Sequence, residues 1–312
     1  MEAVSVINRQ ILVLGSVMLI GFVAGKTGVI DKTVRASLSK LILNVTFAAL
    51  LITTIPSVRM EKGIWADMLL IMTLALISVA GLMLAGLLSG KILGLSLERR
   101  RIFTILHMFG NVAFLAYPLL QALYGARGIL YGALYSVIND ACVWSLGVYL
   151  IKAGGERFSP ADLMHMININ LIAFAAGFGM LLSGVKLGGI PYEALHPVGT
   201  STFYLTMLFV GANLSESRLR DFWEEPAVYL LSAVKLLAFP LLAAAAVLSL
   251  GLASPAARVA VLQIAMPSGV IVPLLAEMHG KDTVFAVRGV VATTLLSLAT
   301  LPFMVYILGI IF

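Results

Sequence analysis

The sequence predicts an all-α membrane protein with ten transmembrane helices, arranged as two five-helix repeats of opposite orientation. Hydrophobic residues make up 61% of the 312-residue chain, charged residues only 12%, and the mean hydropathy is +1.04. Backbone groups in hydrocarbon must find partners within the protein, and the apolar runs lack the alternation typical of a barrel, so they indicate helices. An internal repeat and the distribution of basic residues support the same architecture.

Ten apolar runs of roughly 20 residues mark the expected spans, since about that many residues cross the bilayer core as a helix. They cover residues 5–25, 37–56, 64–89, 100–122, 128–151, 164–184, 197–214, 226–250, 256–278 and 285–312. Five runs precede the loop from Gly154 to Asp162 and five follow it. We therefore expect a first repeat over residues 1–152 and a second over 163–312. An odd number of spans in each half inverts the second half relative to the first.

The internal repeat is visible as a short motif. PLLQALYG, residues 118–125, returns 155 positions later as PLLAEMHG, residues 273–280. Each copy lies in an apolar segment that proline and glycine interrupt. Paired interruptions at corresponding positions of two halves point to the binding site of a transporter.

Basic residues fall mostly on one side of the predicted membrane. Fourteen lie after odd-numbered spans: Lys26, Lys32, Arg35, Lys40, Lys91, Arg99, Arg100, Arg101, Lys152, Arg157, Arg218, Arg220, Lys281 and Arg288. Six lie on the opposite side: Arg9, Arg59, Lys62, Arg127, Lys186 and Arg258. The positive-inside rule makes the first side cytoplasmic, with both termini on the other side. This bias accounts for the net charge of +6, so no nucleic-acid partner is predicted.

The chain lacks the sequence signatures of an enzyme. HExxH, GxSxG and Walker A motifs are absent from the sequence. The single cysteine, Cys142, excludes an internal disulfide and a thiolate metal cluster, and we predict no cofactor. Without a nucleotide-binding loop, uphill movement of a solute would draw on an ion gradient, and the residues leave H⁺ and Na⁺ both open.

Spans four and nine carry the interruptions. Pro118, Pro267 and Pro273 lack the N–H that a helix requires, so three carbonyls need other donors, those of Phe114, Gln263 and Gly269. Gly110 and Asn111 precede the first proline, and Ser268 lies between the other two. A helix that restarts after such a break directs unpaired N–H groups and partial positive charge into the gap. The ligand expected in this gap is therefore an anion.

Asn111 is the first candidate for binding the substrate. Its amide can donate two hydrogen bonds to a carboxylate without a tight ionic grip, although it could instead cap the neighbouring half-helix. His107 lies one turn earlier on the same face, where it could carry a proton or simply pack through a hydrogen bond.

Asn139 and Asp140 lie halfway along span five, where a carboxylate is costly and suggests a function with a nearby partner. Lys235, deep in span eight, is the candidate partner. A structural ion pair and a coupling or gating role for Asp140 and Lys235 both stay open.

Weaker candidates surround the two breaks. Gln263, Ser268 and the backbone of Gly269 would line the break in span nine. Asn44 and Thr46 in span two could form the other side of the pocket, or could only join helices by hydrogen bonds.

Four segments together resemble the auxin efflux carrier family, which includes the plant PIN proteins and bacterial permeases assigned to malonate or malate. They are GNVAFLAYPL (110–119), YGARGILYGALYSVIND (124–140), VWSLGV (143–148) and MPSGVIVPLLAEMHG (266–280). The family segment similar to NVTFAALLI in span two usually has proline where this chain has Ala48.

The resemblance implies two inverted repeats in which spans four and nine cross near mid-membrane, as in sodium/proton antiporters and bile-acid carriers. Spans one, two, six and seven would form a scaffold domain, and spans three to five and eight to ten a transport domain that moves like an elevator. From the same resemblance we expect Asn111 to contact the substrate carboxylate, the protein to form a homodimer, and the membrane to be a bacterial inner membrane.

We therefore predict a secondary transporter for a small organic anion, a mono- or dicarboxylate. An exporter of aromatic acids such as auxin is the alternative within the family. The alternative outside the family is a channel, since broken helices also line pores, or a membrane sensor without transport activity.

Overall fold

The computed structural model describes residues 2–152, 159–215 and 225–311. Within these ranges the regular elements are helices, apart from one isolated β-bridge. The basic residues Arg157, Arg218 and Arg220 and most of the central loop lie outside the described residues.

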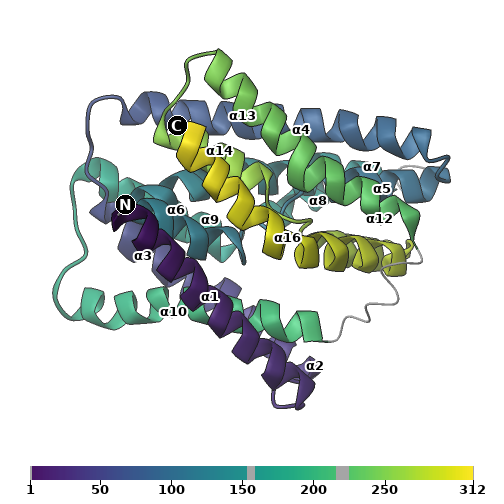
Figure 1. Cartoon of the computed structure of the whole chain (residues 1–312). Coiled ribbons are helices and arrows are strands. Elements are labelled where there is room, and N and C mark those ends of the chain that lie inside the picture. The colour runs from purple at the N-terminus through teal and green to yellow at the C-terminus, as the bar shows by residue number, and fades with distance from the viewer. Residues whose placement is uncertain (1, 153–158, 216–224, 312) are drawn as a thin grey trace. The chain divides into compact units, whose positions relative to one another are not determined.

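The helices follow one another along the chain as drawn in Figure 1. The α-helices are α1 (Glu2–Lys26), α2 (Lys32–Leu41), α3 (Phe47–Thr54), α4 (Ile64–Ile92), α5 (Leu97–Met108), α6 (Ala116–Cys142), α7 (Val148–Lys152), α8 (Pro160–Leu163), α9 (Ile169–Ser183), α10 (Gly189–Ser215), α12 (Pro226–Ala233), α13 (Phe239–Ser249), α14 (Pro255–Ile264), α15 (Ile271–Met278) and α16 (Thr283–Ile311). Short 3₁₀ turns are η2 (Ile55–Ser57) and η4 (Met164–Met166), and π-helical turns are η1 (Ile42–Thr46), η3 (Val143–Gly147) and η5 (Val234–Ala238).

Five helical stretches among the described residues are long and apolar enough to cross a membrane: Lys32–Ser57, Ile64–Ile92, Ala116–Lys152, Pro226–Ser249 and Thr283–Ile311. Each of them overlaps a predicted span. Three shorter apolar helices, Leu12–Lys26, Ile169–Ser183 and Pro255–Ile264, lie in further predicted spans. The all-helical membrane class is therefore confirmed, while the complete layout of ten inverted spans stays a prediction.

The chain divides into two compact units. Unit 1 consists of Met1–Ile64, Ala113–Ala133 and Ile167–Ser217, and unit 2 of Trp65–Val112, Leu134–Met166 and Arg218–Phe312. The boundary passes through α6 after Ala133.

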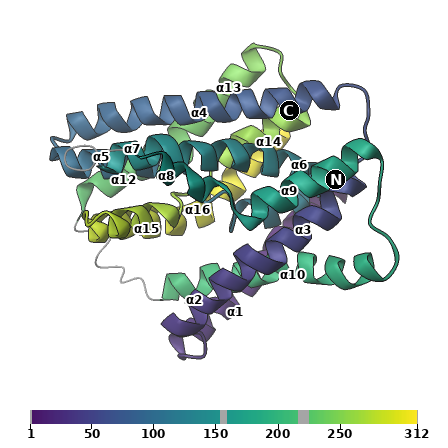
Figure 2. The same cartoon turned by 180° about the vertical axis from the view of Figure 1, so that it is seen from behind.

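Unit 1 is built on close helix contacts at small residues. α10 runs along α1 and also packs against α3 (Figures 1 and 2). A Cβ added to Gly199 of α10 would lie 2.7 Å from the backbone nitrogen of Leu50. Small residues allow such close approach, which is the usual way for helices to associate in lipid. The buried Arg35 adds a hydrogen bond of 3.3 Å to the Ala212 carbonyl near the end of α10.

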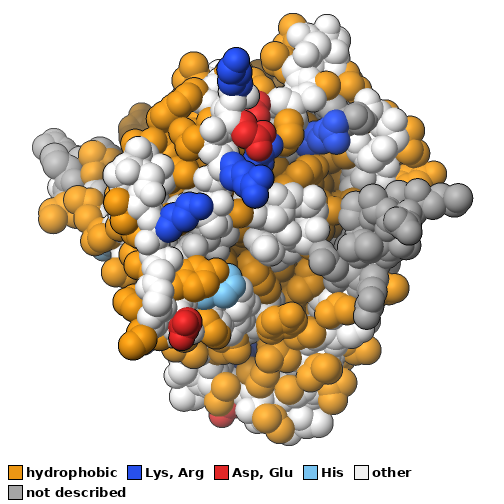
Figure 3. Space-filling model, turned by 90° about the vertical axis from the view of Figure 1, so that its left-hand side faces the viewer, with side chains coloured by type: hydrophobic (Ala, Val, Ile, Leu, Met, Phe, Trp, Pro, Cys, Tyr) orange, Lys and Arg blue, Asp and Glu red, His pale blue; other side chains and the backbone are white. Residues whose placement is uncertain are grey.

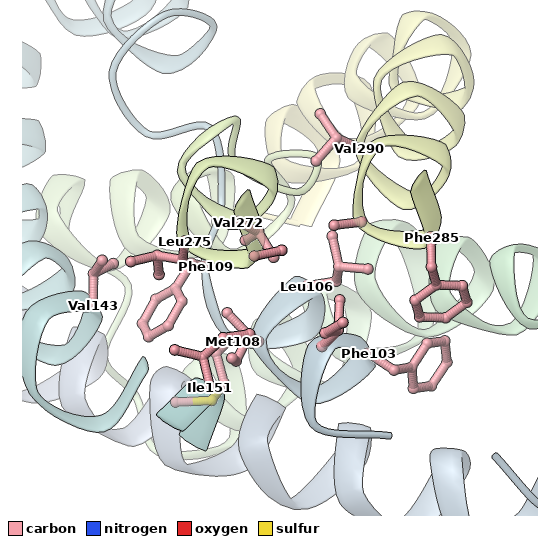
Figure 4. Packing of buried hydrophobic residues seen from close by; sticks show 14 of the residues in the cluster. Phe103, Leu106, Met108, Phe109, Val143, Ile151, Val272, Leu275, Phe285 and Val290 are labelled. Carbon is pink, nitrogen blue, oxygen red and sulfur yellow. The ribbon is translucent and has the colours of Figure 1, made fainter. Parts of the chain in front are cut away.

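Unit 2 has an apolar core around α5. Phe103, Leu106 and Phe109 pack with Val272 and with other buried side chains from η3, α7, α15 and α16 (Figure 4). Fully burying each such side chain contributes about 1.5–3 kcal/mol where the alternative is water. This core fixes the end of α5 against the start of α15.

Charged groups join the ends of three helices in unit 2. The Arg99 guanidinium contacts Asp282 at 2.9 Å and Glu225 at 3.3 Å, and it lies 5.1 Å from the ring centroid of Phe285. Asp282 also accepts a hydrogen bond of 3.0 Å from the Phe285 N–H at the start of α16. Since partly exposed ion pairs contribute only about 0–1 kcal/mol each, this network mainly aligns the helix ends.

Large apolar side chains are exposed on many helices, including Ile92 and Ile190, each 81% exposed. Hydrophobic side chains spread over much of the face in Figure 3, and charged ones gather in a few places. A surface of this composition suits lipid, because soluble monomers rarely expose such large apolar areas.

Candidate functional site

Two helix breaks meet in unit 2. α5 ends at Met108 and is followed by extended backbone at Phe109, and α14 ends at Ile264 and is followed by a turn at Ala265. Gly110 and Ser268 form an antiparallel β-bridge. The Asn111 N–H donates to the Pro267 carbonyl at 2.7 Å, and the Gly269 N–H donates to the Phe109 carbonyl at 2.9 Å. We call residues 109–111 and 267–269 the paired segments.

Glycine makes this pairing sterically feasible. A Cβ added to Gly269 would lie 2.9 Å from the Gly110 carbonyl oxygen, closer than real Cβ contacts allow. A Cβ added to Gly110 would lie 3.3 Å from the Cβ of Met266. The two glycines that the sequence marked as interruptions therefore allow two backbones to approach.

Serine caps start the two helices that lead into the breaks. The Ser96 hydroxyl accepts from the Arg99 N–H at 3.4 Å before α5, and the Ser254 hydroxyl accepts from the Ala257 N–H at 3.3 Å before α14. Pro255 occupies the first position of α14, where a missing N–H costs nothing.

The repeated motif adopts the same local structure in both copies. Pro118 is the third residue of α6, and Pro273 is the third residue of α15, so both stand where a helix needs no N–H donor. The glycine that ends each motif has positive φ, 57° at Gly125 and 58° at Gly280. The repeat in the sequence is therefore also a repeat in conformation.

Two of the carbonyls expected to lack donors have local ones, which corrects that expectation. The Gln263 carbonyl accepts from the Met266 N–H at 3.2 Å, and the Gly269 carbonyl accepts from the Val272 N–H at 3.1 Å. The chain tightens into i+3 turns on either side of the break, so prolines 267 and 273 leave neither carbonyl unpaired.

The carbonyl end of α5 is satisfied by groups from elsewhere in unit 2. Lys235, in the π-helical turn η5 and only 1% exposed, donates from Nζ to the His107 carbonyl at 2.6 Å. The Ser268 hydroxyl donates to the Leu106 carbonyl at 2.8 Å. A cation stabilises the negative end of a helix dipole, so Lys235 both completes a hydrogen bond and offsets that partial charge.

Asp140 does not pair with Lys235 in the part of the chain that the structure describes. The Asp140 carboxylate accepts instead from the Nδ2 of its neighbour Asn139, at 3.3 Å. Lys235 donates instead to the buried His107 carbonyl at the end of α5. A role of either residue in coupling or gating stays a prediction.

The other candidates fall into two groups. His107, Asn111, Gln263 and Ser268 are buried at or next to the paired segments of unit 2. His107 contacts the Phe103 carbonyl through Nδ1 at 2.8 Å.

Asn44, Thr46 and Pro118 belong to unit 1, so their part in a substrate site stays a prediction. Thr46 accepts a hydrogen bond of 2.9 Å from Thr202, and Asn44 donates to the Lys40 carbonyl at 2.9 Å. Both residues lie in η1, a π-helical turn just before Ala48.

Sequence reasoning missed the role of Thr293 at the paired segments, and it missed the π-helical turns in both units. Thr293 on α16 accepts a hydrogen bond of 3.0 Å from the Ser268 N–H, and its own hydroxyl donates to the Gly289 carbonyl at 2.8 Å. A threonine inside an apolar span was the available signal. The π-helical turns η1, η3 and η5 were also missed, since they leave no local sequence signature, yet such turns are frequent at functional sites.

The site offers no constellation for a metal: no group of three or more His, Cys, Asp or Glu side chains close enough to hold an ion occurs in the described ranges.

Asp162, in the short helix α8 outside the predicted spans, has a lowered pKa because the Ser159 N–H and then the Lys152 ammonium hydrogen-bond its carboxylate.

Long apolar helices, an exposed apolar surface and two broken helices that pair through their backbones define an integral membrane protein of the transporter class. The family model for "Membrane transport protein" matches residues 6–305. A protein of Methanothermobacter thermautotrophicus (strain Delta H), described as an uncharacterized transporter, is 27% identical over 292 residues, which cover 91% of this chain and 93% of that protein. The chain therefore belongs to the membrane transport protein family, the auxin efflux carriers, and is a membrane transporter.

Proposed function

We propose that the protein is a secondary transporter for a small organic anion, a mono- or dicarboxylate such as malonate or malate, in a bacterial cytoplasmic membrane. The observation that carries this proposal is the backbone pairing of the two breaks, Asn111 to Pro267 and Gly269 to Phe109. Irregular backbone inside a membrane protein is tolerated where protein buries it or where it lines a cavity, and in transporters such breaks form the substrate site.

The charge distribution around the paired segments favours an anion. α15 begins at Ile271, directly after them, and the first N–H groups of a helix carry partial positive charge. The opposite, carbonyl end of α5 would repel an anion, but Lys235 and Ser268 cover it. The Asn111 amide adds hydrogen-bond donors without a full charge, so that release stays fast.

The two compact units support an elevator-like cycle in which unit 2 moves against unit 1. Unit 1 includes predicted spans one, two, six and seven, and unit 2 includes spans three, eight, nine and ten together with the paired segments. Residues 113–133, from spans four and five, belong to unit 1 and not to the unit that would move. The substrate site would then travel with unit 2. Both termini outside the cytoplasm, H⁺ or Na⁺ as the coupling ion, and a homodimer belong to this proposal as expectations.

A thermal-shift screen of organic acids on the purified protein tests the site. Wild type should be stabilised by at least one mono- or dicarboxylate, and Asn111→Ala should lose that stabilisation. Asn213→Ala, in α10 of unit 1, is the matched control and should keep it. An acid whose effect survives Asn111→Ala would rule out the assignment of the site.

A further inference from the structure

The side-chain amide of Gln263 is buried and lacks hydrogen-bond partners within the described part of the chain. The residue lies next to the last residue of α14 and is 1% exposed. Neither Oε1 nor Nε2 has a hydrogen-bond partner among the described residues. Leaving one buried polar group unpaired costs about 1–3 kcal/mol, so an amide with both ends unpaired indicates that something else completes it.

The position of Gln263 ties it to the candidate site. A Cβ added to Gly110 would lie 3.5 Å from the backbone oxygen of Gln263. The backbone of residue 263 is therefore a direct neighbour of the paired segments.

The two ends of an amide restrict the chemistry of its partner. Oε1 only accepts and Nε2 only donates. A carboxylate would satisfy Nε2 and leave Oε1 unpaired, and a metal cation would do the reverse. A protonated carboxyl group carries an O–H donor beside a C=O acceptor, and it satisfies both ends at once.

We infer that Gln263 binds a carboxyl group of the substrate in its protonated form, so that a dicarboxylic acid binds as the monoanion and carries one proton with it. This inference rests on the proposed function and specifies the substrate. A hydroxyl group beside a carboxylate also offers one donor and one acceptor. The probes below distinguish a protonated carboxyl group from such a hydroxyl group.

A second buried acceptor supports a ligand that brings a donor. His107 Nδ1 lies 2.8 Å from the Phe103 carbonyl, so the neutral ring donates there and Nε2 is left as an acceptor. Nε2 is buried and has no partner among the described residues.

The other ionisable groups near α14 do not supply the donor. α13, which packs against α14, has no ionisable side chain, and α16 has Arg288, which contacts Glu225 at 3.9 Å, and Tyr306, which is 65% exposed. Arg258 lies on α14 itself and has other contacts. Lys235 is occupied at the His107 carbonyl.

Three probes that differ at one end test the inference by thermal shift on the purified full chain between pH 5 and pH 8. Malonate should bind more weakly as the pH rises, by about tenfold per unit above the pKa of its second carboxyl. Malonamate replaces that carboxyl with an amide, which keeps donor and acceptor at every pH, and it should bind independently of pH. Monomethyl malonate has an ester without a donor and should bind at least tenfold more weakly than malonamate.

Gln263→Leu separates binding from folding. The variant should be at least as heat-stable as wild type without ligand, because it removes an unpaired buried amide, and it should lose the response to malonate and malonamate. Thr300→Val, which removes a buried unpartnered hydroxyl of α16, should keep both responses.

Several results would overturn the inference while the proposed function stands. The first is malonate binding that does not change with pH. The second is malonamate binding that weakens as the pH rises, which a titrating His107 would cause. The third is malate binding at pH 8 where malonate does not bind, which would assign the donor to a hydroxyl group. An unchanged malonate response in Gln263→Leu would show that only water meets the amide. If no organic acid stabilises wild type at any pH, the proposed function fails and the inference falls with it.

Discussion

The Nζ of Lys235 lies 2.6 Å from the backbone oxygen of His107, in the last turn of the half-helix that leads into the first break. A lysine that is 1% exposed is thus used to terminate a helix inside the membrane. The contact pairs one of the last carbonyls of α5, and the Ser268 hydroxyl pairs the preceding one.

Replacing Lys235 with methionine should destabilise the protein by about 1–3 kcal/mol, since the His107 carbonyl loses its donor in a buried place. Lys235→Gln keeps an N–H donor and should lose less. Thermal unfolding of the purified variants measures the difference. Lys91→Met, at an exposed lysine of α4, is the control for removing a charge. Equal unfolding temperatures for the methionine and glutamine variants of Lys235 would contradict the capping role.

Thr293→Val should lower the thermal unfolding temperature by several degrees, because the buried Ser268 N–H loses its acceptor. Thr293→Ser keeps the hydroxyl and should stay near wild type. Should valine and serine behave alike, the hydrogen bond to Ser268 would not be what stabilises the paired segments.

Gly269→Ala should abolish substrate transport and reduce stability, since its Cβ would lie 2.9 Å from the Gly110 carbonyl and would force the paired segments apart. Gly309→Ala in α16 is the matched control, because no heavy atom lies within 4 Å of a Cβ there. That control should be neutral or slightly stabilising, as alanine favours a helix by about 0.5–1 kcal/mol over glycine. Uptake of a labelled acid into proteoliposomes measures transport by both variants. Uptake by Gly269→Ala at the wild-type rate would contradict the close backbone contact between the paired segments.

Asp162→Asn should make the protein less stable at neutral pH and should have no effect in strong acid. The pKa of the Asp162 carboxyl is lowered by hydrogen bonds from the Ser159 N–H and the Lys152 ammonium. A lowered pKa stabilises the fold above the ordinary pKa of aspartate, and this contribution disappears as the pH falls through the folded value. Unfolding temperatures of both proteins, measured from pH 7 down to pH 3, should differ by a constant amount above the ordinary pKa of aspartate and by less below it. A constant difference over that range would show that the charge of Asp162 is not responsible.

Part of the local structure followed from residues whose chemistry is local. Pro118 and Pro273 were predicted to interrupt spans four and nine, and both lie in the first turn of a helix. Gly110 and Gly269 were expected to line the gap, and the structure shows in addition that they let two backbones approach. These residues restrict φ, remove a donor or remove a Cβ, and each effect acts within a turn of the chain, whatever surrounds it.

The partners of buried polar side chains did not follow from the sequence. Lys235 was expected to meet Asp140, but it contacts a backbone carbonyl on α5. The choice depends on which acceptor lies within reach after α5 and η5 have packed, and a carbonyl at a helix end leaves no trace in the residue types. Thr293 was not predicted for the same reason, since its hydroxyl accepts from the Ser268 N–H only because the chain bends there.

Counterflow in proteoliposomes tests the central claim most directly, namely that an organic anion binds at the paired segments and is carried. Vesicles loaded with unlabelled malonate should accumulate labelled malonate transiently and saturably with wild type and with Asn213→Ala. They should not do so with Asn111→Ala, although that variant should reconstitute and unfold at a similar temperature. Counterflow by Asn111→Ala at the wild-type rate, or a flux that rises with concentration without saturating, would contradict the account.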